Sequence, residues 1–206
     1  MKAVFLSALA LCLAASSLAS DARSKLLASP AQAAQAADKT APSYDMKGQS
    51  VVDLQQLQKK FTDLAAAIPA DKYTWRPAEG VRSFSELFLH VSAANYGIPS
   101  MMGVPMPEGF DGKNFEKSTT DKAKIIEQMN KSFASAIAAV QAMTNAGFAK
   151  AEKKLGPDAN DGDVVYILVT HAHEHLGQSI AYARQNGIIP PWTAAAMKKD
   201  AKAPQE

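Results

Sequence analysis

The sequence predicts an all-helical protein whose main domain is a four-helix bundle. Residues that favour helices dominate the 206 positions, and only 7% of the residues are aromatic. No segment alternates polar residues with apolar, β-branched ones, which is the pattern of a half-buried strand. Four segments instead repeat apolar residues every three or four positions, which places them on one face of a helix. Together these observations favour the all-α class.

The first 19 residues have the features of a Sec-type signal peptide. A short positive start precedes an apolar run at positions 3–15, which is too short to span a bilayer. Ser17-Leu18-Ala19 is the expected cleavage signal. The single cysteine, Cys12, follows the bulky Leu11, which argues against lipidation at this position. We therefore expect a periplasmic or secreted protein that meets a membrane only through this transient segment and has no disulfide after cleavage.

Three further segments follow the signal peptide. Residues 20–47 are rich in Ala, Gln, Ser, Asp and Lys and are predicted to be a flexible linker, with a loosely docked first helix as the alternative. Residues 48–192 carry the helical pattern and form the predicted bundle domain, and residues 193–206 form a charged tail. The formal net charge is only +2, and Lys and Arg gather on no one face, so nucleic-acid binding is not expected.

The first two helices of the bundle are separated by a turn that contains one of the two tryptophans. Helix one is predicted at residues 48–68 and ends before Pro69. Ser83 and Glu86 make a capping box, which marks the start of helix two, and this helix ends by Pro99. The apolar face of helix one consists of Val51, Leu54, Leu57, Phe61, Leu64 and Ile68.

The last two helices are predicted at residues 121–144 and 163–186, with Gly187 suited to the position after a helix end. Between helices two and three, residues 101–119 contain several glycines and prolines. We interpret them as a long loop and as a candidate rim of a pocket. The inward face of the last helix is expected to run through Val164, Ile167, His171, His175, Gln178 and Tyr182.

The histidines are the clearest chemical feature. His171 and His175 are four residues apart, so they point the same way from one helix, whereas His173 points to the opposite side. His90 lies on the inward face of helix two and is a candidate third ligand, since metal sites in bundles draw ligands from facing helices. The alternatives are buried histidines that hydrogen-bond Gln178 or Tyr182, and histidines that bind nothing.

Three neutral imidazoles suit a divalent transition metal such as Zn²⁺, Ni²⁺, Fe²⁺ or Cu²⁺ better than Mg²⁺ or Ca²⁺. Three protein ligands also leave a coordination position open, which is typical of reactive metal sites rather than structural ones. The sequence favours none of these transition metals over the others.

At these residues the chain resembles the DinB/YfiT-like superfamily of metal-binding four-helix bundles, over about residues 50–192. The segment 73–77 (Tyr-Thr-Trp-Arg-Pro) is similar to the family's turn between helices one and two, and Ser83-Phe84-Ser85-Glu86-Leu87 with His90 resembles its second helix. The family's fourth helix is similar to the pattern His171-x-x-x-His175-x-Gly177-Gln178, which is followed here by residues 182–187 and a Pro-Pro pair. The resemblance implies that His90, His171 and His175 are the metal ligands. Glu174 and Leu176 stand where the family often has His and Arg.

The resemblance also suggests a chemistry. Characterised members are similar to thiol-dependent S-transferases that use bacillithiol, mycothiol or glutathione, and to a maleylpyruvate isomerase. We therefore expect a metal-dependent transferase or hydrolase-like enzyme acting on a small molecule, in which the metal activates water or polarises a thiol or carbonyl. The sequence does not identify the small-molecule substrate. A homodimer is common among similar proteins.

Several residues are candidates for roles around the metal. Glu174 is a candidate catalytic base, and Gln178, Tyr182 and Trp75 are candidates for lining the substrate pocket; packing or capping is the alternative for each. His171-x-x-Glu174-His175 also matches the H-x-x-E-H pattern of certain metalloproteases, but Glu206 is the sole glutamate after His175 that remains as a third ligand. The main alternative to an enzyme is a non-catalytic protein of the cell envelope that binds a metal or a small ligand.

Overall fold

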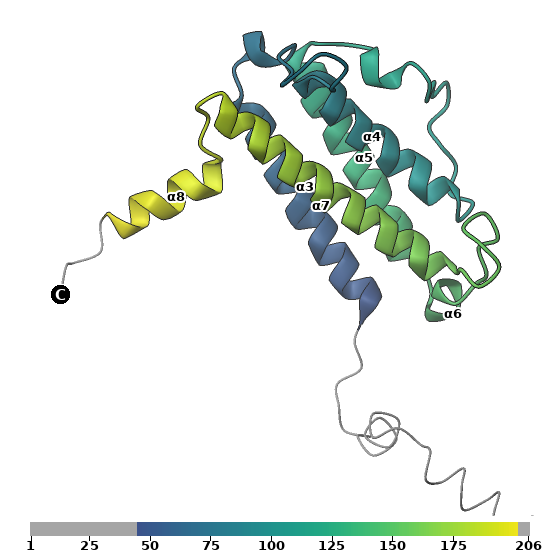
Figure 1. Ribbon diagram of the computed structural model, residues 1–206. Coiled ribbons are helices and arrows are strands. Elements are labelled where there is room, and N and C mark those ends of the chain that lie inside the picture. Colours follow the sequence, from purple (N-terminus) through teal and green to yellow (C-terminus); the bar gives the residue numbers. More distant parts are fainter. Residues whose placement is uncertain (1–44, 202–206) are drawn as a thin grey trace, which may run out of the picture. The chain divides into compact units, whose positions relative to one another are not determined.

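The structure is a computed structural model, and it describes residues 45–201. The predicted signal peptide, with Cys12, and residues 20–44 of the predicted linker lie outside the described residues. Four long helices form a bundle: α3 (Met46–Ala67), α4 (Phe84–Ser100), α5 (Lys122–Ala142) and α7 (Asp161–Gln185) (Figure 1). The predicted all-α, four-helix-bundle fold is confirmed.

Shorter helices lie in the connections and at the end of the described chain. These are the 3₁₀ helices η1 (Ala70–Lys72) and η2 (Phe115–Lys117), and the α-helices α6 (Asn145–Phe148) and α8 (Pro191–Asp200). No helix within residues 45–201 combines the length and the apolar character needed to cross a bilayer.

The four long helices do not pack in chain order. Helices α3 and α4 each pack mainly against α5 and α7, so these two consecutive helices stand diagonally across the bundle. The connection between them therefore has to cross one end of the bundle, whereas the connection from α4 to α5, which contains η2, runs back along α4 to that same end (Figure 1). This arrangement makes α4 and α7 direct neighbours, although residues 101–160 separate them in the chain.

Side-chain caps set the starts of the two helices that carry histidines. The predicted capping box is present at α4: the Ser83 hydroxyl accepts from the Glu86 amide, and the Glu86 carboxylate accepts from the Ser83 amide. A second capping box, between Asn160 and Asp163, starts α7 at Asp161, slightly earlier than the predicted residue 163. Gly187 follows the end of α7 with a positive φ of 71°, a conformation that glycine adopts without steric cost.

A cluster of aromatic rings fills the end of the bundle where α3 passes into the turn before α4. Phe61, Phe88 and Phe133 are fully buried, and the ring of Phe61 contacts both of the others. The buried Tyr73 hydroxyl donates to the Ala65 carbonyl oxygen at 2.8 Å, which ties the turn to the end of α3. The amide of Ser85 donates to the Tyr73 carbonyl oxygen at 2.9 Å, so the entry into α4 is fixed as well.

The structure departs from the sequence analysis in several further details. Helix α3 begins at Met46, so residues 46 and 47 belong to the bundle rather than to the linker. Pro99 lies inside the last turn of α4, which ends at Ser100. Ile167 was predicted on the inward face of α7 but is exposed, and Leu168 is buried instead. Residues 193–200, predicted as part of a charged tail, continue helix α8.

Candidate metal centre

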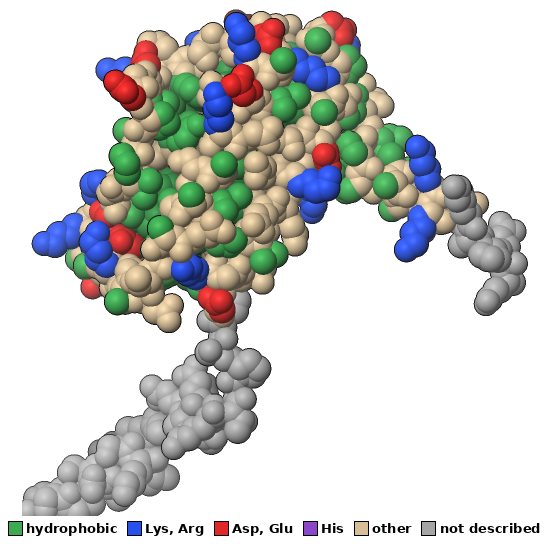
Figure 2. Space-filling model, turned by 180° about the vertical axis from the view of Figure 1, so that it is seen from behind, with side chains coloured by type: hydrophobic (Ala, Val, Ile, Leu, Met, Phe, Trp, Pro, Cys, Tyr) green, Lys and Arg blue, Asp and Glu red, His purple; other side chains and the backbone are tan. Residues whose placement is uncertain are grey.

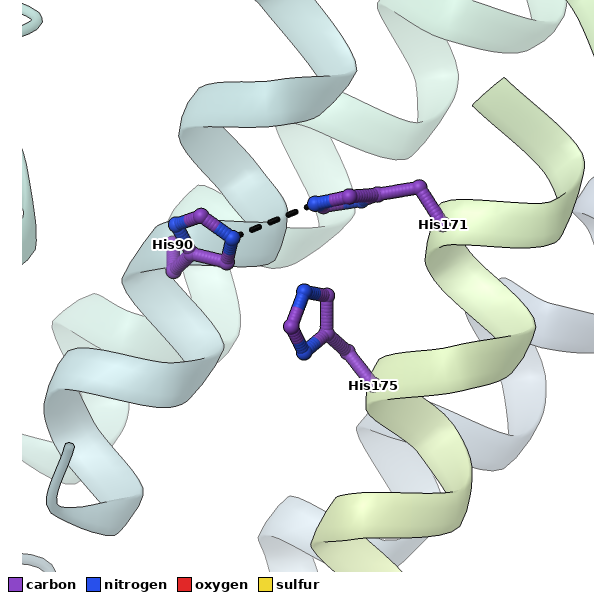
Figure 3. Close-up of side chains that lie close together, drawn as sticks. All are labelled: His90, His171 and His175. Atoms are coloured by element: carbon purple, nitrogen blue, oxygen red, sulfur yellow. Dashed lines mark hydrogen bonds between the residues drawn. The ribbon is translucent and has the colours of Figure 1, made fainter. Parts of the chain in front are cut away.

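Helices α4 and α7 bring three of the four histidines together (Figure 3). His90 projects from α4, and His171 and His175 project from successive turns of α7 toward it. One ring nitrogen from each lies within 4.8 Å of the others, and the Nε2 atoms of His90 and His171 are 3.1 Å apart. His175 is buried and the other two are half-buried, whereas His173 is exposed. The sequence spacing therefore places these histidines as expected.

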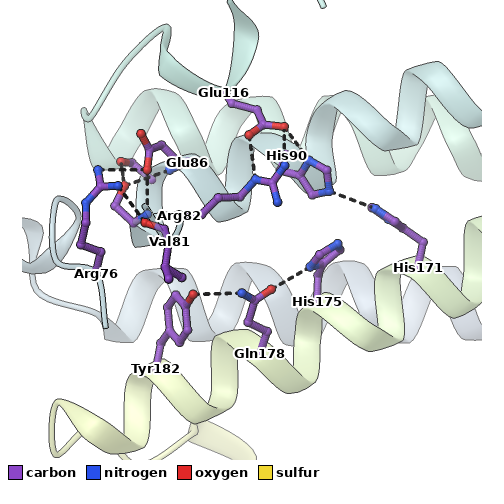
Figure 4. A network of polar contacts seen from close by, with 12 residues as sticks. Arg76, Val81, Arg82, Glu86, His90, Glu116, His171, His175, Gln178 and Tyr182 are labelled. Atoms are coloured by element: carbon purple, nitrogen blue, oxygen red, sulfur yellow. Dashed lines mark hydrogen bonds and ion pairs between the residues drawn. The ribbon is translucent and has the colours of Figure 1, made fainter. Parts of the chain in front are cut away.

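Glu116 of η2 holds the ring of His90. Its Oε1 atom lies 2.6 Å from the His90 Nδ1 atom (Figure 4). Arg82 donates to both oxygens of the same carboxylate, from Nε at 2.7 Å and from Nη2 at 3.2 Å. Because an ionised carboxylate only accepts hydrogen bonds, the His90 Nδ1 atom carries the proton, and in the neutral ring the Nε2 lone pair faces the other histidines.

A second chain of hydrogen bonds holds His175 from within α7. The His175 Nδ1 atom lies 2.9 Å from the Gln178 side-chain oxygen, and the Gln178 amide nitrogen donates to the Tyr182 hydroxyl at 2.9 Å (Figure 4). The amide oxygen can only accept, so His175 also carries its proton on Nδ1. In two of the three imidazoles the Nδ1 atom therefore carries a proton, and the Nε2 atom has a lone pair that can bind a metal.

His171 lacks such a partner. Its Nδ1 atom is buried and makes no hydrogen bond among residues 45–201. Burial, followed by the nearby charges of His175, His90 and Arg82, lowers the pKa of His171 to about 4, so the ring is neutral at pH 7. An unpaired buried polar group of this kind costs about 1–3 kcal/mol.

The neighbouring groups also have shifted pKa values. Burial lowers the pKa of His90, although its hydrogen bond to Glu116 acts in the opposite direction. Burial raises the pKa of Glu116, but the hydrogen bonds from Arg82 and His90 outweigh this effect, and the net pKa is lowered. At neutral pH His90 and His171 are therefore neutral, and the carboxylate behind His90 is ionised.

This arrangement fits a divalent transition metal. Two Nε2 lone pairs are fixed toward a common centre, and a third neutral imidazole lies at the same centre with a nitrogen that no other contact satisfies. A histidine that is backed by a carboxylate through its other nitrogen is the usual arrangement at protein metal sites. Three imidazole nitrogens without a thiolate or a free carboxylate suit zinc, nickel or iron, and do not suit magnesium or calcium.

The remaining candidate residues lie around this cluster at different depths. Trp75 is half-buried, and its ring packs against Phe84 and edge-on against Tyr182, with centroid distances of 5.7 and 5.5 Å. The Trp75 side chain therefore helps to fix the position of the Tyr182 ring. Glu174 is exposed and forms no hydrogen bond or ion pair within the described part of the chain. Nothing in the structure connects Glu174 to the three histidines.

Arg82 and Glu116 are parts of the site that sequence reasoning missed. Glu116 lies in the irregular segment 101–119, which has no periodicity that would place a side chain, and it is 26 residues from His90. The only sequence feature that could have pointed to Glu116 was the glycine- and proline-rich loop that contains it, which was predicted to rim a pocket. A cavity of about 590 Å³ does lie beside the histidine cluster, and Arg82, Glu116 and Gln178 are among the residues that line it. Figure 2 shows the face behind that of Figure 1, and no histidine is visible there.

Comparison with known proteins places the chain in a family. The sequence profile of the DinB superfamily matches residues 53–179, which is more than half of the chain. No functionally curated protein matches it. A solved DinB-like protein from Bacillus cereus is similar in fold, with a TM-score of 0.58 and 17% identity, over 68% of this chain and 93% of that one.

A second solved structure, YfiT from Bacillus subtilis, is described as a probable metal-dependent hydrolase with an unusual four-helix bundle topology. It also has a TM-score of 0.58, at 12% identity, over 73% of this chain and 93% of that one. At these identities the two structures support the fold alone. The family match, the bundle and the three converging histidines agree, and the chain belongs to the DinB superfamily.

Proposed function

We propose that this protein is a metal-dependent enzyme of the transferase or hydrolase type, which holds one divalent transition-metal ion between His90, His171 and His175. The observation that carries the proposal is the convergence of these imidazoles from two helices, with one nitrogen of each within 4.8 Å of the others. The description of YfiT as a probable metal-dependent hydrolase supports the same class of chemistry.

A bound ion would supply Lewis acidity that polarises a substrate thiol, carbonyl or water. The chain's own residues prepare the site for it. Glu116 and Gln178 keep the Nδ1 protons of His90 and His175 in place, so both rings present Nε2. Arg82 holds the Glu116 carboxylate through two hydrogen bonds and adds a positive charge beside the reaction space.

We also propose that the protein acts outside the cytoplasm, in the periplasm or after secretion. The support is the sequence of residues 1–19, with its short positive start, apolar run and small residues. Detection of a mature chain that begins near residue 20 in the periplasmic or culture fraction tests this part. A full-length chain retained in the cytosol contradicts it.

One observation favours a non-catalytic alternative, in which the protein binds a metal or small ligand in the cell envelope. Both oxygens of Glu116 are already bonded, to His90 and Arg82, and Glu174 is exposed without a contact to the cluster. Among residues 45–201, no carboxylate is therefore free beside the histidines to act as a general base.

The experiment that separates these functions begins with untagged protein, purified without added metal. Elemental analysis should find one transition-metal ion per chain. The protein should then convert either a thiol and electrophile pair or an activated ester, and a chelator should abolish the turnover until metal is restored. The variant His171→Ala should lose both metal and turnover, while His173→Ala, on the exposed side of the same helix, should keep both.

Metal binding without turnover of either substrate class would support the non-catalytic alternative. Absence of metal from correctly folded protein would refute the metal-dependent enzyme and leave only small-ligand binding from the alternative.

A further inference from the structure

The cavity beside the histidine cluster is lined mainly by charged side chains. Its volume is about 590 Å³, and its polar lining consists of Arg76, Arg82, Lys117, Glu86, Glu116 and Gln178. Three of these carry a positive charge and two a negative charge, so the lining has one positive charge in excess. A cavity with this balance favours a ligand with one negative charge.

Hydrogen bonds show where the excess charge lies. Arg76 forms an ion pair with Glu86 at 3.1 Å and donates to the Val81 carbonyl oxygen at 2.7 Å, so it is occupied in holding the turn before α4. Arg82 uses Nε and Nη2 for Glu116. Its Nη1 atom and the Lys117 ammonium group have no hydrogen-bond or ion-pair partner in residues 45–201, and these two groups are the available donors.

The same cavity adjoins the residues that hold the histidines. Glu116 and Gln178 line it, and they contact His90 and His175. Figure 4 shows the Arg82 guanidinium group beside the His90 ring, and both reach the Glu116 carboxylate. A small molecule that extends from this cavity past Glu116 and Gln178 would have the basic side chains at one end and the histidine cluster at the other.

We propose that the substrate carries a carboxylate, which the Arg82 Nη1 atom and the Lys117 ammonium group bind while the reacting part of the molecule extends toward the three histidines. A single carboxylate matches the excess of one positive charge, whereas a phosphate dianion exceeds it. This inference rests on the proposed metal-dependent function, because it names the substrate class of the same site.

A neighbouring cavity provides an internal comparison. It has a volume of about 710 Å³, and Tyr96, Phe110 and Phe115 supply aromatic walls. Lys117 lines both cavities, so loss of its charge alone does not identify the one that binds the carboxylate. The two can be distinguished by NMR, since Val81, Arg82 and Gln178 line only the charged cavity.

The test uses a pair of probes with the same number of carbon atoms that differ at one end: succinate monohydroxamate has a carboxylate there, and the neutral butyrohydroxamate has a methyl group. Binding of each is measured by calorimetry on the full mature protein, once loaded with zinc and once free of metal. We expect the carboxylate probe to bind about fivefold more tightly than the neutral one in both states, since one charged contact at a partly exposed site is worth about 1 kcal/mol. NMR shifts should concentrate on Val81, Arg82 and Gln178.

Two charge reversals on the same loop provide the matched variants. Lys117→Glu should remove the preference for the carboxylate probe without changing zinc affinity, and Lys113→Glu, which lies outside both cavities, should keep the preference. Equal binding of the two probes to the wild-type protein would overturn the proposal. So would tighter binding of phosphonoacetohydroxamate than of the carboxylate probe, or NMR shifts confined to the aromatic cavity.

These outcomes are distinct from failure of the proposed function. If the protein binds no zinc, the proposed metal-dependent function is wrong. The relative affinity of the metal-free protein for the two probes then still shows whether the cavity selects a carboxylate. If zinc binds and the preference is absent, only the substrate class is wrong.

Discussion

The two sides of the histidine cluster are built differently. On the side of the charged cavity, His90 and His175 each have a hydrogen-bond partner behind the ring, Glu116 in one case and Gln178 in the other. On the opposite side, His171 has a buried Nδ1 atom without a partner among residues 45–201. Two ligands are therefore held from behind by a protein group, and the third is held only by its helix and by the 3.1 Å contact of its Nε2 atom with that of His90.

The difference indicates how the site divides its tasks. The two anchored imidazoles present their Nε2 atoms to the space where an ion would lie, next to Glu116 and Gln178. The Nδ1 atom of His171 has no protein partner among residues 45–201, so no side chain holds this ring from behind. We expect tight metal binding to require all three histidines, with Glu116 and Gln178 increasing the affinity further.

The largest expected effect concerns removal of the ion. Protein saturated with metal at about 1,000 times its dissociation constant should be more stable than the metal-free protein by about 4 kcal/mol, because the ion binds only the folded state. Thermal unfolding of both forms measures this difference. In His171→Ala the two forms should unfold at the same temperature, and a persistent difference in that variant would show that the ion lies elsewhere.

The next effect tests the anchor of His90. Glu116→Gln keeps the size of the side chain but removes the charge, so metal affinity should fall about 10- to 100-fold, the usual effect of losing a partner behind a ligand. Competition with a chromophoric chelator measures the affinity. Glu108→Gln, an exposed residue of the same loop without a contact to the histidines, is the control. Equal affinities for wild type and Glu116→Gln would refute the anchoring role.

A smaller effect is expected at the anchor of His175. Gln178→Leu removes the acceptor for the Nδ1 proton, and loss of one hydrogen bond of about 1 kcal/mol should weaken metal binding about fivefold. Tyr182→Phe should change it less, since Gln178 keeps its bond to His175. The same chelator competition applies, with the exposed Gln185→Leu of α7 as control. A greater loss in Tyr182→Phe than in Gln178→Leu would contradict this order.

A separate effect concerns the pH dependence of the metal-free protein. The pKa of His171 falls from 6.5 to about 4 on folding, so between these values the unfolded chain binds more protons than the folded one. The free energy of unfolding should therefore decrease as the pH falls from about 6.5 to about 4. Urea titrations across this range measure the slope, and His171→Gln should reduce it. An unchanged slope in the variant would mean that other groups cause the dependence.

The sequence was sufficient for the parts of the site that regular helices position. The four-residue spacing of His171 and His175 places both on one face of α7, and the capping box at Ser83 and Glu86 sets the start of α4. His90 followed as the third candidate ligand from its place on the inward face of helix two, and the resemblance to a known family implied the same three residues. Each of these predictions uses geometry that is fixed within one helix or shared by a family.

The parts that escaped prediction depend on contacts across the fold. Glu116 reaches His90 because an irregular segment folds over α4, and no periodicity in residues 101–119 indicates where one of its side chains points. Ile167 was assigned to the buried face because it is apolar, but the buried positions of α7 there are Val164, Val165 and Leu168. The spacing of residues in a helix gives only the direction of each side chain around the helix axis. Packing against the neighbouring helices decides which of these directions are buried.

The most direct test of the central claim is to count the imidazole ligands of the bound ion. X-ray absorption should show three imidazole nitrogens in the metal-loaded wild type and two in His90→Ala, loaded at a metal concentration high enough to fill the weakened site, because one ligand comes from α4 and two come from α7. The same count in both proteins, or a wild-type site without imidazole, would contradict a metal centre shared between these helices.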